Sequence, residues 1–235
     1  MRVVVTRPQS DSERTAASLE ALGHEVLVAP LMRIEPVAAD LAGAWGAIAI
    51  TSANAPHAIV ENTNGIALKK LPLFAVGRRS AEAARETGFS TVTSANGDVA
   101  DLVRLIAARD AGSKAPLLYL AGEDRAIDLV AELSARGIGA EMRIVYRAVA
   151  VPFPPVLAAA LEAGDVDAVL HFSRRSAENF VAGARMAGVV DTALDVRHLC
   201  LSAQVAEPLA GASRIAIAAR PEEAALIELL RAQPA

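Results

Sequence analysis

The sequence predicts an α/β protein with two parallel-sheet, flavodoxin-like domains, and three observations support this class. Short β-branched runs alternate with Ala-rich amphipathic stretches along the 235 residues. Most of these runs end in a small polar loop, which is typical of βαβ units and parallel sheets. Two segments break the alternation and are expected to be extended: 29–37, with prolines near both ends, and 145–152, which ends in proline.

Ten short runs have the composition of buried parallel strands, whose two faces are both covered by helices. The expected strands are residues 3–5, 25–28, 47–50, 73–76, 91–93, 117–120, 141–145, 168–172, 199–201 and 215–218. Several of the amphipathic stretches that follow them end at a glycine, the residue that favours a helix C-terminus. The expected helices cover about 12–22, 55–62, 80–87, 99–109, 126–136, 177–187 and 221–231, the last beginning with Pro221.

The two extended segments indicate where the chain passes between domains. A crossing at both places leaves five strands in each half and makes the first domain discontinuous. We expect domain 1 at 1–34 and 149–235, domain 2 at 38–144, and a two-segment extended linker at 35–37 and 145–148. A single division near 112–116 and one large sheet are alternatives that the sequence leaves open.

Composition excludes several classes of protein. A net charge of −4 and a pI near 5.6 argue against a general nucleic-acid binder, which is usually basic. No run approaches the ~20 apolar residues of a membrane span, and the first residues are too weakly apolar for a signal peptide. A single cysteine, Cys200, forms no internal disulfide, so we expect a cytoplasmic protein.

The basic residues are unusual in kind. Lysine occurs only at Lys69, Lys70 and Lys114, so 20 of the 23 cations are arginines. Genome base composition explains such a bias without any function. Alternatively, some of the arginines bind carboxylates or phosphates through the planar guanidinium group.

The loops after the expected strands are rich in Ser, Thr, Asn, Gly and Arg. Each hydroxyl residue alone is explained as a helix N-cap. Several such loops at one sheet edge, however, indicate a site for a polyanion, held by backbone amides, hydroxyls and arginines.

Motifs for other chemistries are missing. No G-x-G-x-x-G, P-loop or G-x-S-x-G sequence follows the expected strands. The four histidines stand singly, without metal-ligand spacing. His171 and Cys200 fall inside expected strands, where a buried structural role is the simpler interpretation.

Along essentially its whole length, the chain resembles the uroporphyrinogen-III synthase family. Seven short motifs in the family's order carry the resemblance: Thr6-Arg7-Pro8, Thr51-Ser52-Ala53-Asn54, Val76-Gly77, Gly122-Glu123-Asp124-Arg125, Val145-Tyr146, Phe172-Ser173-Arg174-Arg175-Ser176 and Ser202-Ala203-Gln204-Val205-Ala206. The chain departs from the family at Arg78-Arg79, where a Thr or Lys usually follows the Val-Gly turn.

The resemblance implies two α/β domains with a substrate cleft between them. The substrate is hydroxymethylbilane, a linear octacarboxylate tetrapyrrole, which is closed with loss of water and inversion of ring D through a spirocyclic pyrrolenine. We choose Tyr146 as the candidate general acid, because it lies in the link expected to face this cleft; a packing tyrosine in a hinge is the alternative. The substrate-binding residues that the resemblance implies are Arg7, Thr51, Ser52, Asn54, Gly77, Arg78, Arg125, Ser173, Arg174, Ser176, Ser202 and Gln204.

Neither a metal nor another cofactor is expected, because the reaction needs neither redox chemistry nor a Lewis acid. We expect a monomer that receives hydroxymethylbilane from hydroxymethylbilane synthase, by transient handover. The alternative is a two-domain sensor or binding protein without catalysis, since a fold does not fix a function. Analysis of the porphyrin isomers formed from hydroxymethylbilane distinguishes the two.

Overall fold

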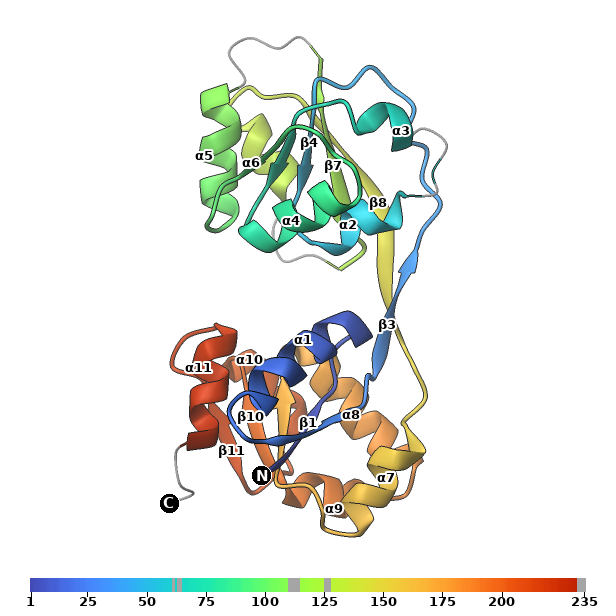
Figure 1. The fold of residues 1–235 in the computed structure, drawn as a ribbon, viewed down its shortest axis with the longest axis vertical. Coiled ribbons are helices and arrows are strands. Elements are labelled where there is room, and N and C mark those ends of the chain that lie inside the picture. Colours follow the sequence, from blue (N-terminus) through green and yellow to red (C-terminus); the bar gives the residue numbers. More distant parts are fainter. Residues whose placement is uncertain (61, 63–64, 110–114, 125–127, 232–235) are drawn as a thin grey trace. The chain divides into compact units, whose positions relative to one another are not determined.

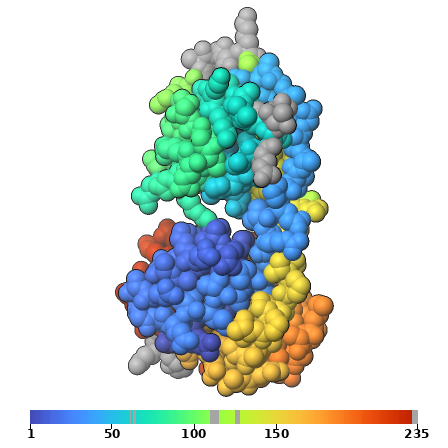
Figure 2. All heavy atoms as spheres, turned by 45° about the vertical axis from the view of Figure 1, so that its right-hand side comes forward, coloured from blue at the N-terminus to red at the C-terminus, as the bar shows by residue number. Residues whose placement is uncertain are grey.

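The computed structural model describes residues 1–60, 62, 65–109, 115–124 and 128–231 (Figure 1). The chain forms two compact units. Unit 1 is Met1–Arg33 with Val149–Ala235, and unit 2 is Ile34–Ala148. Figure 2 shows the discontinuity of unit 1, in which the blue N-terminal residues lie beside yellow and orange ones. The residues expected as links, 35–37 and 145–148, fall in unit 2.

The sheet of unit 1 is parallel. Its strands are β1 (Arg2–Val5), β2 (Glu25–Val28), β9 (Ala168–His171), β10 (Arg197–Cys200) and β11 (Ile215–Ile217). They lie side by side in the order β11-β10-β9-β1-β2. Numbered within the unit, this is the order 2-1-3-4-5 of flavodoxin-like folds.

Helices cover both faces of this sheet, which explains its uniformly apolar strands. Val3 and Val5 pack with side chains of α1 (Gln9–Glu20) and α11 (Glu223–Glu228). Val4 packs on the other face with α7 (Pro155–Glu162), α8 (Arg174–Met186) and α9 (Val190–Asp195). The short α10 (Ala203–Ala206) and the 3₁₀ turns Glu207–Leu209 and Leu229–Arg231 complete the unit.

Two helices of unit 1, α7 and α9, were not expected from the sequence. The terminal helix begins two residues later than predicted. Glu222 has extended dihedral angles and is the N-cap of α11, so Pro221 precedes the helix.

The sheet of unit 2 has the order β3-β8-β7-β4-β5-β6. Its strands are β3 (Met32–Pro36), β4 (Ala47–Ile50), β5 (Leu73–Ala75), β6 (Val92–Ser94), β7 (Leu117–Gly122) and β8 (Ala140–Ala150). The parallel strands β4 to β8, numbered within the unit, have the order 3-2-1-4-5. This is the other doubly wound order, so the flavodoxin order holds for unit 1 alone.

The helices of unit 2 form two layers. Ile48 and Ile50 pack with α2 (Asn54–Ala58), α3 (Gly65–Leu68) and α4 (Arg78–Glu86). Ala49 and Tyr119 pack on the opposite face with α5 (Val99–Arg109) and α6 (Leu129–Ser134). The helix expected to reach residue 62 ends at Ala58.

Both extended segments are strands that pair with each other. The Val37 amide donates to the Val145 carbonyl at 2.8 Å, and the Val151 amide donates to the Leu31 carbonyl at 3.1 Å. Residue numbers rise along one segment as they fall along the other, so β3 and β8 are antiparallel. The strand expected at 141–145 and the link after it are one strand, β8. None of the helices that the structure describes is long and apolar enough to cross a membrane.

Candidate functional site

In unit 2, two tyrosines lie at the carboxyl edge of the sheet, where parallel α/β proteins bind ligands. Tyr119, on β7, is almost fully buried, and its hydroxyl lies 2.8 Å from Thr51 Oγ1, just after β4. Tyr146, on β8, lies close enough to Ser52 for the serine side chain to lower the pKa of the phenol. These are the two tyrosines of the chain. The adjacent residues Thr51 and Ser52 each meet one of them.

Close packing fixes the ring of Tyr146 at the end of β7. A Cβ atom added to Gly122 would lie 2.6 Å from Tyr146 Cζ and 2.8 Å from its hydroxyl oxygen. Any side chain at position 122 would therefore displace the phenol. The strand register shifts between Ala121 and Gly122, which brings Gly122 opposite Tyr146. The glycine of the Gly-x-x-Arg motif thus makes room for the tyrosine of the Val-Tyr motif.

The surroundings of Tyr146 favour its protonated form. Burial is the largest effect and raises the pKa of the phenol above its ordinary value. The charges of Tyr119 and Asp124 act in the same direction, and the side chain of Ser52 opposes them. At neutral pH the phenol therefore carries the proton that a general acid needs.

A second loop of this edge begins α4. Gly77 is the N-cap, with φ −140° and ψ 171°, which any residue adopts. A Cβ atom there would meet no protein atom within 4 Å. The guanidinium of Arg78 is exposed and lies 3.7 Å from Glu82. The backbone amide of Asn54, at the start of α2, donates a hydrogen bond to Ser52 Oγ at 3.1 Å.

In unit 1, the predicted hydroxyls after β9 form a helix cap. Ser173 Oγ accepts from the Ser176 amide at 3.1 Å, and Ser176 Oγ accepts from the Ser173 amide at 3.2 Å. Ser176 Oγ also donates to the Ser173 carbonyl at 2.7 Å. Arg174 is exposed and forms ion pairs with Glu178 at 2.9 Å and Glu207 at 2.8 Å.

Arg7 is held within unit 1 by several groups. Its guanidinium lies 4.2 Å from the centre of the Phe172 ring, 3.4 Å from Glu223 and 3.6 Å from Asp11. Glu223 also accepts hydrogen bonds from Thr15 at 2.7 Å and Arg14 at 2.8 Å. Burial alone would raise the pKa of Glu223, but these hydrogen bonds and the two arginine charges outweigh it and lower the pKa.

The remaining predicted residues are placed less specifically. Ser202 is half-buried and precedes α10 without a side-chain cap bond, and Gln204 is exposed. Arg125 lies outside the described residues. In unit 2, the structure therefore brings Thr51, Ser52 and Tyr146 together. The predicted residues of unit 1 lie at the carboxyl edge of that unit's own sheet.

Two features escaped the sequence analysis. One is Tyr119, which a count of tyrosines and the alternation of β7 could have placed at this edge. The other is a repeat of Arg-Arg-Ser-Ala-Glu, at 78–82 and 174–178. It opens α4 in unit 2 and α8 in unit 1, each after a sheet strand, and neither helix has an acid in its first turn. Two cations at the positive end of a helix dipole are unfavourable for folding alone.

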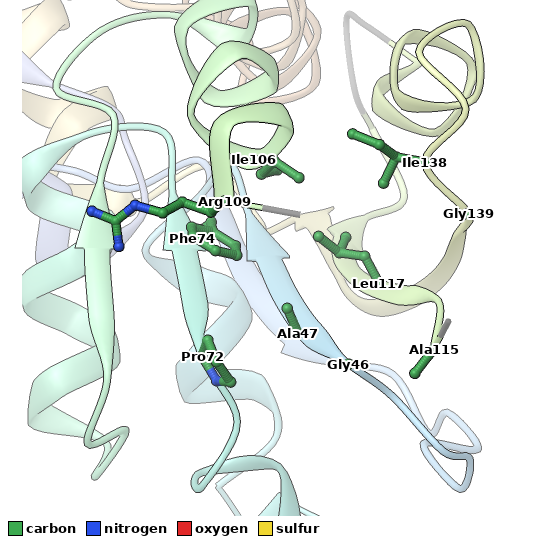
Figure 3. A pocket seen from close by; sticks show the side chains of 10 residues that line it. All are labelled: Gly46, Ala47, Pro72, Phe74, Ile106, Arg109, Ala115, Leu117, Ile138 and Gly139. Atoms are coloured by element: carbon green, nitrogen blue, oxygen red, sulfur yellow. The ribbon is translucent and has the colours of Figure 1, made fainter. Parts of the chain in front are cut away.

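A pocket of about 120 Å³ opens at the amino edge of the second sheet (Figure 3). It lies where β4, β5 and β7 begin, and its lining is mainly apolar, with Phe74, Ile106 and Leu117. Because the tyrosines and the Arg78 loop lie at the opposite edge, this pocket does not belong to the candidate site.

Two buried histidines of unit 1 meet across β9 and β10, so the expectation of single histidines is wrong for this pair. His171 Nε2 and His198 Nδ1 are 3.0 Å apart, and Phe180 packs edge-on against both rings. The strand register sets His171 opposite Cys200, which puts His198 on the same face. Burial lowers the pKa of His198 to about 4, and it lowers that of His171 well below 6.5. Within the described residues, no group of three or more His, Cys, Asp or Glu side chains could hold a metal ion.

These features define a class of protein, a two-unit parallel α/β protein whose strand-end loops carry hydroxyls, amides and arginines suited to an anionic ligand. The family model described as uroporphyrinogen-III synthase HemD matches residues 13–228, and the chain belongs to this family. Members are cyclising lyases of tetrapyrrole biosynthesis. No curated protein matches the sequence significantly.

Solved structures share the fold. A uroporphyrinogen-III synthetase from Helicobacter pylori is 16% identical and has a TM-score of 0.68, covering 98% of this chain and 99% of that chain. The wild-type uroporphyrinogen III synthase of the extremely thermophilic bacterium Thermus thermophilus is 21% identical with a TM-score of 0.46, covering 98% of this chain and 96% of that one. The Helicobacter likeness confirms the fold class, an α/β protein with two parallel-dominated sheets.

Proposed function

We propose that this protein is an active uroporphyrinogen-III synthase, which cyclises hydroxymethylbilane with loss of water and inversion of ring D. The match of the family model over residues 13–228 carries the proposal. The described geometry agrees with it, because the strand-end loops present donors for carboxylates and a protonated phenol.

Tyr146 is proposed as the general acid. Its phenol gives a proton to the terminal hydroxyl of the substrate, which leaves as water and generates an azafulvene. The substituted carbon of the last pyrrole then attacks this centre, and the spirocyclic pyrrolenine reopens and closes with ring D inverted. The proton released when the macrocycle forms can return to the phenolate, so the acid is regenerated. The raised pKa and the fixed ring of Tyr146 support this assignment.

The two Arg-Arg-Ser-Ala-Glu helix starts are proposed to bind carboxylates of the substrate. Their arginines, Arg78 and Arg174 among them, oppose the helix dipole, so an anionic ligand would relieve that repulsion. The open space around Gly77 supports close approach of a ligand, since neither its backbone nor its neighbours require glycine. Thr51, Ser52, Asn54, Ser173, Ser176, Ser202, Gln204 and Arg7 remain proposed contacts.

Beyond the reaction, we infer a cytoplasmic monomer. The single, buried Cys200 supports a reducing compartment. Transient handover of the unstable hydroxymethylbilane from its synthase is also proposed, because a free linear tetrapyrrole closes by itself. Light scattering at micromolar protein concentration tests whether the protein is a monomer.

Product analysis tests the activity. The protein is mixed with freshly made hydroxymethylbilane, the products are oxidised, and the porphyrin isomers are separated. We expect isomer III in molar excess over protein. Binding of hydroxymethylbilane without enrichment in isomer III would instead indicate the non-catalytic sensor.

A further inference from the structure

We propose that Tyr119 is a positioning residue, which holds the Thr51-Ser52 turn so that Ser52 keeps the hydroxyl of Tyr146 aimed at the substrate. The inference deepens the proposed function and rests on it. Tyr119 itself is almost fully buried, 2% exposed, so it acts through its neighbours and does not contact substrate.

Successive side chains of β4 point to opposite faces of the sheet, which explains how the turn after β4 reaches both tyrosines. Ala49 packs in the same cluster as Tyr119, whereas Ile48 and Ile50 pack in the cluster that Tyr146 contacts. Thr51 continues the first face and meets the Tyr119 hydroxyl at 2.8 Å. Ser52, the next residue, meets Tyr146. One hydrogen bond and one neighbouring hydroxyl, on opposite faces, therefore link two consecutive residues to the two tyrosines.

The turn needs such a hold because its own helix is short. α2 spans only Asn54–Ala58, and its N-cap, Ala53, provides no side-chain cap bond. Within the turn, the Asn54 amide is bonded to Ser52 Oγ at 3.1 Å. A hydroxyl on a buried ring of β7 adds a rigid anchor, since β7 is paired on both sides, with β4 and β8.

The charged and titratable groups near Tyr146 come from β7, the loop after it, β8 and β3. Tyr119 faces it from β7, and Asp124 faces it from the loop after β7. The ion pair of Arg147 with Glu35, at 3.1 Å, lies one residue further along β8. Substitution of Tyr119 by Phe leaves Asp124 and this ion pair in place, so it isolates the effect of one hydroxyl.

The kinetic test compares Tyr119→Phe with Ile106→Val, a small change in the same apolar cluster. Because the substitution displaces the acid and leaves the carboxylate-binding arginines in place, we expect kcat to fall by about tenfold and KM to stay within about twofold. Ile106→Val is expected to leave both unchanged. An unchanged kcat, an equal loss in Ile106→Val, or a rise in KM alone would overturn the proposal.

A double-mutant cycle tests the route through Thr51. In a Thr51→Val protein the bond to Tyr119 is already lost, so adding Tyr119→Phe should reduce kcat no further. Additive losses would contradict the route.

A readout without substrate separates this inference from the proposed function. With tyrosine labelled by ¹³C at Cζ, the two tyrosines give two resonances, which Tyr119→Phe and Tyr146→Phe assign. We expect the Tyr146 resonance to move in Tyr119→Phe and to stay in place in Ile106→Val. If wild-type protein made no isomer III but the resonance moved, the proposed function would fail and the coupling would stand. An unmoved resonance would overturn the coupling itself.

Discussion

Tyr146 is the residue on which the proposed chemistry depends most directly. Its ring lies against Gly122, and burial keeps its phenol protonated. The Val-Tyr motif is enough to predict this tyrosine as a candidate acid. The alternation of β7 can place Tyr119 at the edge, but no local signal reveals its bond to Thr51, because that bond joins residues that are 68 positions apart.

Replacement of Tyr146 by Phe removes the proton and keeps the ring. General acid catalysis contributes about 10²–10⁴-fold, so we expect kcat to fall by at least ~10²-fold with KM little changed. Turnover is followed in an assay coupled to hydroxymethylbilane synthase, and circular dichroism checks the fold. Wild-type turnover in a folded variant would exclude Tyr146 as the acid.

Arg7 shows what a motif does not reveal about a residue. The Thr-Arg-Pro motif predicts Arg7 at the carboxyl edge of the first sheet. Nothing in the motif indicates that Glu223, 216 positions away, lies 3.4 Å from its guanidinium. Its role in substrate binding stays a prediction.

At the scale of elements, strands are more predictable than helices. Every expected strand overlaps an observed one. A short β-branched run between polar loops rarely adopts a structure other than a strand. The expected helix to residue 62 ends at Ala58, and α7 was not expected. Short amphipathic stretches depend on tertiary packing, which local propensity does not report.

The helix α4 allows a matched comparison of two of its arginines. Arg78 opens the helix, where a cation is disfavoured, and Arg85 lies in its last turn, where a cation is favoured. Arg78→Gln is expected to lose one charge-assisted hydrogen bond to the substrate. We therefore expect this variant to raise KM by roughly tenfold. Its thermal midpoint should not fall.

The control variant is Arg85→Gln, which loses a bond to the Val92 carbonyl and the favourable dipole interaction. It should lower the thermal midpoint slightly and leave KM unchanged. Equal effects of the two substitutions on KM would show that position on the helix does not matter.

The buried histidine pair on β9 and β10 predicts that the stability of unit 1 falls at acid pH. The pKa of His198 falls from 6.5 unfolded to about 4 folded, so between these values the unfolded state binds the extra proton. The contribution of His198 to the free energy of unfolding is therefore fully present above pH 6.5 and is lost as pH falls toward 4. Between pH 7 and 5 the loss for His198 is about 2 kcal/mol.

Urea unfolding at both pH values measures this loss. His198→Gln cannot titrate, so its free energy of unfolding should change less between pH 7 and 5 than that of wild-type protein. Identical changes in the two proteins would show that the buried histidines do not control the acid response.

At the scale of the whole molecule, the order of weak motifs predicts the family, which the match over residues 13–228 confirms. The two extended segments indicate a discontinuous organisation, because proline and the absence of helical periodicity are visible in the sequence. Their pairing is not visible, since β3 and β8 are more than a hundred residues apart. The strand order of the second sheet also follows from tertiary packing rather than from any local pattern.

The central claim is that the protein directs ring closure toward inversion. The most direct measurement is the ratio of isomer III to isomer I formed from hydroxymethylbilane, with catalytic protein and without it. Spontaneous closure keeps ring D in place and gives isomer I. The account predicts that isomer III predominates when protein is present, and that Tyr146→Phe moves the ratio toward the value without protein. An isomer ratio that is the same with and without wild-type protein would contradict the account.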